Sequence, residues 1–298
     1  MIINNATLHA AFVGFKTAFN QGYAEAKMYA DDIAMSVPSS AREETYAWLG
    51  QTPGLREWIG PRHVGGLASY SFTIKNRTFE STVAVPREDF QDDRYGLFGR
   101  YFSEMGYNTR RHKEQLIFGL LKDGFTGTGY DGQSFFDTDH PIVLNEAETL
   151  TVSNTQAGSD PAWFLLDTSR VVRPIIWQER EPYTFTSLTR ESDHNVFFER
   201  QYLYGVHARV NCGYGLWQLA FGSKAALNEA NYALARAAMM NLRADGGRLL
   251  GVMPTTLVVP PALEAAALHL LNTETKDGGG SNPWKGTAKL IVTPEVAE

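Results

Sequence analysis

The chain has 298 residues, 43% hydrophobic and 20% charged, so it can form one large core or two smaller ones and is too apolar for a disordered protein. Lysine and arginine number 27 against 33 aspartates and glutamates, and the formal charge of -6 gives no indication of a phosphate-neutralising surface of the kind that duplex DNA requires. Cys212 is the only cysteine, which excludes a disulfide framework and a multi-cysteine metal cage and fits a reducing cytoplasm. Residues 1–21 lack the pattern of a secretory signal, and no apolar run reaches the roughly 20 residues that cross a bilayer.

The N-terminal region predicts an amphipathic helix over residues 4–20. Its apolar residues recur at three- and four-residue spacings, and they are Leu8, Ala11, Phe12, Phe15, Ala18 and Phe19. A single helix cannot bury such a stripe by itself. We therefore expect it to dock either on the body of the protein or on a neighbouring copy.

Residues 36–66 are rich in proline, glycine and serine, yet they also contain Trp48 and Trp58. Solvated linkers seldom carry two tryptophans, because each buries on the order of 150–250 Å² in a packed site. The segment is therefore predicted to be an extended arm that lies against protein.

Residues 70–85 are rich in β-branched and aromatic types on both sides of Lys75, Asn76 and Arg77, which predicts a β-hairpin with its turn at these three residues. A two-stranded hairpin is marginally stable alone, so Phe79 and its neighbours are expected to lie on a further surface, which could belong to another chain. Lys75 could attack an amide of a neighbouring copy, but a solvated turn lysine is the favoured interpretation.

A long helix is predicted over about residues 93–123, after a short acidic helix that Pro86 opens. It would be roughly 40 Å long, with a weak point near residues 106–108. This helix is the best candidate for a structural spine.

The remaining residues predict a mixture of strands and helices. Strand patterns occur at 162–166, 173–178, 202–210, 214–220, 256–259 and 288–292, and helix patterns at 224–242 and 261–271. The last third therefore reads β-α-β, a compact α/β lobe, and the whole chain belongs to the α+β class.

Residues 124–141 are the stretch most similar to an enzyme site. Asp131, Asp137, Asp139 and His140 could coordinate a divalent cation in a hydrolase or nuclease. The competing interpretation, tight turns with local side-chain hydrogen bonds, is favoured because the glycines lack the residues that complete a phosphate-binding loop.

Two further groups have competing interpretations. Cys212, with His207 five residues earlier, could be a thiol nucleophile, but a buried structural cysteine is favoured. Arg173 and Arg180 stand among other charged residues; they could form a charge network between subunits or simply lie on a solvated strand face. The neighbouring charges are Arg170, Glu179, Glu181 and Arg190.

Several longer motifs, taken in order, resemble one protein family. They are TYAWLGQ (45–51), LREWIG (55–60), TIKNRTFESTVAVP (73–86), FGLLKDG (118–124), DGQSFFDTDHP (131–141) and YGLWQLA (214–220). Together they resemble the major head subunit gpT of Mu-like phages and prophages, and the resemblance continues to residues 288–292. Each motif alone would be weak, whereas the ordered set spans essentially the whole chain.

The resemblance implies the fold of the major capsid proteins of tailed phages and herpesviruses. Its expected parts are an N-terminal arm (1–45), an extended β-hairpin loop and its approach (46–86), a peripheral domain with the spine helix (87–222) and an axial domain (223–298). The breaker-rich residues 50–66 are the expected hinge between arm and loop orientations.

The resemblance also implies a structural protein of the virion that is not an enzyme and has no catalytic, cofactor or metal site. Its copies would assemble in the host cytoplasm, as hexamers and pentamers, into an icosahedral shell around the phage genome. A separate scaffold, a portal ring and a maturation protease would take part, and packaged double-stranded DNA would be held non-specifically, with no membrane. The alternatives left open are the hydrolase or nuclease and a tail or decoration protein. Candidate contact residues are Phe12, Phe15, Trp48, Trp58, Lys75, Arg77, Phe79, Arg173 and Arg180.

Overall fold

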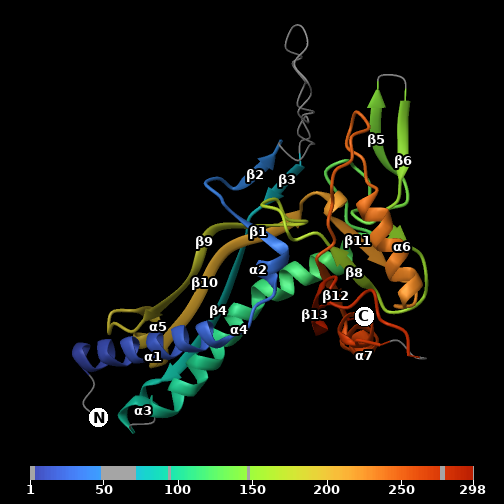
Figure 1. Cartoon of the computed structure of the whole chain (residues 1–298). Helices are drawn as coiled ribbons and strands as arrows, with labels where there is room; N and C mark the ends of the chain where they lie inside the picture. Colours follow the sequence, from blue (N-terminus) through green and yellow to red (C-terminus); the bar gives the residue numbers. More distant parts are fainter. Residues whose placement is uncertain (1–3, 48–71, 93–94, 146–147, 276–278, 298) are drawn as a thin grey trace.

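A computed structural model of the chain describes residues 4–47, 72–92, 95–145, 148–275 and 279–297. It shows an α+β protein with an elongated lobe and a second lobe, joined by the long helix α4 (Tyr95–Lys122) (Figure 1). Within the described part, no helix is long and apolar enough to cross a membrane. Trp48, Trp58 and the expected hinge at 50–66 lie outside the described residues.

The elongated lobe is built on a four-stranded sheet in the order β1-β9-β10-β4. Its strands are β1 (Ala34–Pro38), β9 (Ile175–Leu188), β10 (Gln201–Tyr214) and β4 (Arg77–Pro86). β1 is parallel to β9, whereas β10 is antiparallel to both β9 and β4. Every second residue of β10 from Tyr202 to Val210 is buried, so one face of the sheet faces the core and the other faces outward.

The helix α1 (Asn5–Glu25) begins where the sequence predicts, because Asn4 and Thr7 form a reciprocal capping box. Leu8, Phe15 and Phe19 are buried in a core shared with α4 and the sheet. The predicted apolar stripe is therefore covered by the protein's own body, the first of the two expected possibilities. The short helices of this lobe are α2 (Ala30–Ile33), α3 (Arg87–Gln91) and α5 (His194–Glu199).

Two glycines allow α1 and α4 to touch through their backbones. A Cβ atom at Gly22 would lie 1.8 Å from the carbonyl oxygen of Ser103, and one at Gly106 would lie 2.0 Å from that of Phe19. α4 is continuous through residues 106–108, so the predicted weak point there is wrong. Gly106 instead permits the close approach of a second helix.

The predicted hairpin over residues 70–85 is also wrong. β3 (Phe72–Lys75) pairs with β2 (Glu43–Tyr46), whereas β4 pairs with β10, so β3 and β4 belong to different sheets. Asn76, expected in an exposed turn, is 7% exposed. The strands that flank residues 48–71 are therefore β2 and β3, and Lys75 does not lie at a hairpin tip.

The second lobe is built on a five-stranded sheet in the order β13-β12-β8-β11-β7. Its strands are β7 (Thr155–Gln156), β8 (Trp163–Leu166), β11 (Ala220–Ser223), β12 (Thr256–Val259) and β13 (Lys289–Val292). The helices around it are α6 (Glu229–Met240), α7 (Glu264–Asn272) and the 3₁₀ turns η1 (Asp123–Phe125), η2 (Trp217–Leu219), η3 (Pro261–Leu263) and η4 (Pro294–Val296). The predicted β-α-β unit is confirmed, since β12 and β13 are parallel and α7 connects them.

Two features of this lobe differ from expectation. Residues 214–220 are not one strand, because the turn η2 separates the end of β10 from the start of β11. In addition, β5 (His140–Asn145) and β6 (Glu148–Val152) form an antiparallel pair (Figure 1). The sheet also draws β7, β8 and β11 from residues before 224, so the expected boundary at residue 222 does not separate the two sheets.

Candidate assembly surfaces

The junction between the N-terminal segment and α4 centres on Glu114. This carboxylate is 6% exposed and accepts hydrogen bonds from the backbone N–H groups of Tyr29 and Ala30 (2.8 Å for Ala30), at the start of α2. Burial raises the pKa of Glu114, the two N–H donors oppose the rise, and the negative charges of Asp31 and Glu295 add to it. Glu114 thereby attaches the chain after α1 to the middle of α4.

Ion pairs surround this junction and join three distant parts of the chain. They are Asp31 with Lys113 (2.6 Å) and Arg110 (3.4 Å), Asp32 with Lys289 (2.7 Å), and Arg111 with Glu295 (2.6 Å). Each pair is partly exposed and individually weak. Their common effect is to hold α2, α4 and the C-terminal residues together.

The base of the 48–71 segment is held by a buried hydrogen-bond network around Gln178 of β9. Tyr46 Oη donates to Gln178 Oε1 (2.8 Å), and Gln178 Nε2 donates to Ile74 O (3.1 Å) and to Asn76 Oδ1 (2.8 Å). Asn76 Nδ2 in turn donates to Ser39 Oγ (2.8 Å). Because these groups are buried and mutually satisfied, the two strands that carry the segment are rigidly attached to the large sheet.

The candidate contact residues differ in how available they are to another chain. Phe15 is 3% exposed within its own core, and Phe12 is half-buried, with its ring stacked on Phe185 (5.8 Å). Lys75 is exposed on β3, and Arg77 is exposed on β4, where its guanidinium lies over the ring of the half-buried Phe79 (5.0 Å). Of these five, Lys75 and Arg77 are the most accessible.

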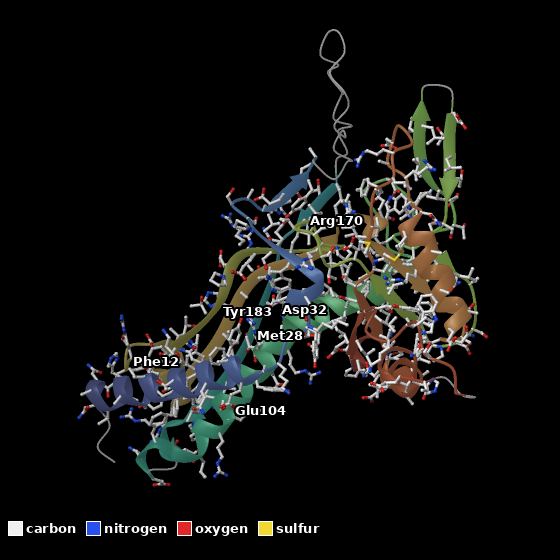
Figure 2. All side chains as sticks on the ribbon, in the orientation of Figure 1. Phe12, Met28, Asp32, Glu104, Arg170 and Tyr183 are labelled. Atoms are coloured by element: carbon white, nitrogen blue, oxygen red, sulfur yellow. The ribbon has the colours of Figure 1, made fainter. Side chains whose placement is uncertain are left out.

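The charged residues for which a network was one of two interpretations do not gather in one place. Arg170 lies toward the second lobe (Figure 2) and binds Asp167 (3.2 Å), whereas Arg173 Nη1 donates to Asp32 O (3.2 Å). Arg180 is half-buried on β9, and Arg190 is exposed beyond the far end of that strand. Arg170 and Arg173 therefore serve separate local contacts.

The residues expected for a hydrolase or nuclease form local turns. His140 Nδ1 lies 2.7 Å from Asp131 Oδ2, and the buried imidazole stacks on Trp217 at 3.9 Å. Asp137 accepts a hydrogen bond from the N–H of Thr138 (2.6 Å). In the part of the chain that the structure describes, no three His, Cys, Asp or Glu side chains gather as metal ligands. These contacts are the local hydrogen bonds of the turn interpretation.

Cys212 lies on β10, where its Sγ donates to Leu116 O (3.2 Å). Burial raises the pKa of its thiol to about 12. A thiol in this environment stays protonated at neutral pH and is inert, which supports the structural interpretation.

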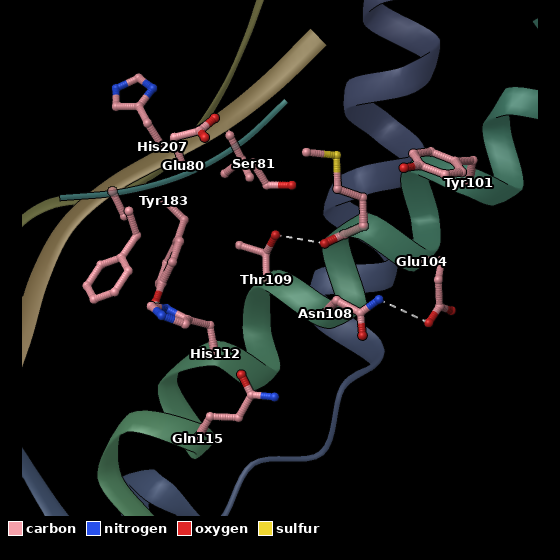
Figure 3. Close-up of a pocket in the computed structure, with 14 residues that line it drawn as sticks. Glu80, Ser81, Tyr101, Glu104, Asn108, Thr109, His112, Gln115, Tyr183 and His207 are labelled. Carbon is pink, nitrogen blue, oxygen red and sulfur yellow. Dashed lines mark hydrogen bonds between the residues drawn. The ribbon is translucent and has the colours of Figure 1, made fainter. Parts of the chain in front are cut away.

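A cavity of about 430 Å³ lies between α4 and the strands β4, β9 and β10 (Figure 3). His112 Nδ1 and Tyr183 Oη are hydrogen-bonded across it (2.7 Å). Burial, reinforced by the charge of Arg77, lowers the pKa of His112, and burial raises that of Tyr183. Both shifts favour neutral side chains, so this bond joins α4 to β9 and is not an activated acid–base pair.

Sequence reasoning missed the most exposed aromatic residues of the molecule's described part. Phe197 and Phe198 are 73% and 69% exposed on α5. The signal was present as two adjacent phenylalanines in a polar stretch of sequence, but a six-residue helix is too short to show a period. Exposed pairs of this kind are typical of contact surfaces.

Comparison with known proteins gives a consistent result over nearly the whole chain. The family model described as Mu-like prophage major head subunit gpT matches residues 8–296. The major capsid protein of Escherichia phage Mu is 40% identical over 301 residues, which cover 98% of this chain and 99% of that protein.

Solved structures agree with the sequence relatives. A chain from the procapsid of bacteriophage JBD30 matches with a TM-score of 0.87 and 42% identity, covering 98% of this chain and 100% of that one. A chain from the JBD30 capsid matches with a TM-score of 0.82 and 30% identity, covering 99% and 100%. The likeness thus includes both lobes and the helix that joins them.

Proposed function

The chain belongs to the family of Mu-like prophage major head subunits, and from this premise we propose that its copies assemble as hexamers and pentamers into an icosahedral phage head. It is a structural subunit of a capsid shell and is located in the virion. The observation that carries the proposal is the full-length similarity, in sequence and fold, to the procapsid subunit of bacteriophage JBD30.

Each part of the chain has a separate role in the proposed assembly. Residues 1–45 serve as the arm, 46–86 as the extended loop and its approach, and 87–222 as the peripheral domain with α4 as its spine. Residues 223–298 form the axial domain, to which the sheet order supports adding β7, β8 and β11. Hexamers and pentamers need slightly different loop orientations, and we place the hinge in residues 50–66.

The proposed contacts between copies use residues that the chain leaves accessible. Lys75 and Arg77 flank the buried Asn76 at the base of the extended loop, and both are exposed. Trp48 and Trp58 are proposed as aromatic contacts of the loop itself. Phe12, Phe79, Arg173 and Arg180 remain weaker candidates because each is half-buried in its own chain.

Other partners follow from the role of a head subunit. We propose that assembly uses a separate scaffold, a portal ring and a maturation protease. The formal charge of -6 supports holding packaged DNA by confinement and not by tight binding. No residue is assigned a catalytic role, and the tail or decoration alternative is not retained, because the family match is to head subunits.

Electron microscopy of the purified full chain, expressed alone and with a scaffold, tests the proposal. We expect capsomers and closed shells. Tubes or small flat rings would support a tail or decoration protein, and a chain that stays monomeric at every concentration would contradict the shell function. Turnover of nucleic acid that requires a divalent cation and is abolished by Asp137→Ala would revive the enzyme alternative.

A further inference from the structure

The far end of the elongated lobe carries an exposed aromatic pair. Phe197 and Phe198 lie on α5, which follows β9 at the end of the sheet opposite the second lobe (Figure 1). Their rings are 4.9 Å apart in an edge-to-face arrangement, and Leu188, at the end of β9, is also 53% exposed. This aromatic tip, defined as Leu188, Phe197 and Phe198, is an apolar surface at one extremity of the molecule.

The exposure of the aromatic tip does not come from a loosely held loop. Asn195, in the same short helix, is 6% exposed, and its Nδ2 donates to Leu188 O (3.2 Å) and Gln201 O (2.7 Å). Arg200 adopts the left-handed conformation (φ 54°), and its carbonyl accepts a hydrogen bond from Arg87 N (2.9 Å). The rings are therefore presented from an ordered base that is hydrogen-bonded to the sheet on both sides.

We infer that the aromatic tip contacts the same tip of other copies in the assembled shell, an inference that rests on the proposed function. Charges of both signs border the tip: Arg200 pairs with Glu88 (3.1 Å), and Arg87 approaches Glu191 (3.7 Å). Glu191 and Arg200 remain largely exposed. A border of mixed sign allows identical surfaces to meet without net repulsion, because the arginines of one copy can face the glutamates of the other.

The size of the aromatic tip indicates when this contact forms. Two phenylalanines at these exposures offer roughly 200–350 Å² to a partner, whereas a stable interface buries about 800 Å² per partner. The tip is therefore too small to hold two free copies together. It contributes only where other contacts have already placed the copies side by side, as in a shell.

Cross-linking of the full chain tests the inference. Phe197→Cys and Phe198→Cys shells, treated with a short bismaleimide, are expected to give a product of two chains, which the unassembled chain does not give. Cys212 is half-buried, and its thiol reacts little because desolvation raises its pKa to about 12. Leu234→Cys, 61% exposed on α6, reports the background. The inference would be overturned if no cross-linked product formed, or if cross-linking did not exceed that of Leu234→Cys. A product that contains a different protein would overturn it as well.

An assembly assay tests the same inference without cysteine chemistry. The double variant Phe197→Ser with Phe198→Ser is expected to unfold at the same urea concentration as the wild type and to form shells with a yield lower by about tenfold or more. Equal yields would overturn the inference and leave the shell function intact. A wild-type chain that forms no shells would refute the proposed function, and this inference with it.

Discussion

The helices α1 and α5 both carry phenylalanines, but only α1 covers them within its own chain. Phe15 of α1 stacks on Phe102 of α4 at 4.5 Å, and Phe19 stacks on Phe185 at 5.0 Å. The rings of α5 face solvent from an equally ordered base. An apolar stripe therefore predicts that a surface is buried, but it does not show whether the same chain or another chain buries it. The two helices differ in their backbone contacts: the contact at Gly106 brings α4 close enough to α1 to help cover its phenylalanines.

The largest expected effect is a loss of stability when a buried phenylalanine of α1 is removed. Phe15→Ala should lower the free energy of unfolding by about 3–5 kcal/mol, because it removes a ring in contact with several aromatic neighbours and leaves a cavity. Urea unfolding measures the change. A loss below about 1 kcal/mol would show that α1 contributes little to the folded state.

The second effect tests the backbone contact itself. Gly106→Ala should destabilise the chain by about 1–3 kcal/mol, since its Cβ would meet the backbone of Phe19. A Cβ atom added at Gly119 of the same helix would have nothing within 4 Å, so Gly119→Ala should be neutral or stabilising by up to about 1 kcal/mol. Similar urea midpoints for the two variants would contradict close packing at Gly106.

The pH dependence of the free energy of unfolding tests the role of Glu114 at the junction that follows α1. Folding raises the pKa of Glu114, so the stability contributed by this carboxyl is complete below its ordinary value of 4.5 and is lost as the pH rises through the raised value. Relative to Glu114→Gln, the wild type should therefore lose stability from about pH 4.5 toward neutral pH. Glu104→Gln, which alters an exposed carboxylate on α4, controls for the change in charge. Parallel pH profiles for wild type and Glu114→Gln would exclude this role.

The smallest effect on stability is expected from a substitution of an exposed phenylalanine on α5. Phe197→Ala should change the free energy of unfolding by no more than about 0.5 kcal/mol, because most of the ring is already in water. The same urea series as for Phe15→Ala measures it. A loss comparable to that of Phe15→Ala would mean that α5 is part of the core and not a contact surface.

Local patterns predicted the regular elements well and their partners poorly. The spacing of Phe15 and Phe19 predicted α1, and the run ending near Gly124 predicted α4 within a few residues. The hairpin predicted at Lys75–Arg77 was wrong because Asn76 looks like a turn residue, whereas its side chain is buried in hydrogen bonds with Gln178 and Ser39 that the local sequence does not show.

The functional conclusion depended on different information from the fold. Exposed aromatic segments suggested that copies cover one another, yet the α1 stripe is covered by its own chain. The ordered motifs, and then the full-length match to head subunits, identified the family. The aromatic tip escaped prediction because α5 is short and its two phenylalanines, read alone, are equally compatible with a buried strand.

The long helix α4 contributes to the two largest hydrophobic cores. Phe102 and Met105, in its first half, belong to the core of α1 and the large sheet, while Ile117, Phe118 and Leu121 belong to the core that continues into the second lobe. Any rotation of one lobe against the other must therefore curve this helix or slide it along one core. Because one continuous helix packs in both cores, a movement of one lobe relative to the other is mechanically coupled through α4.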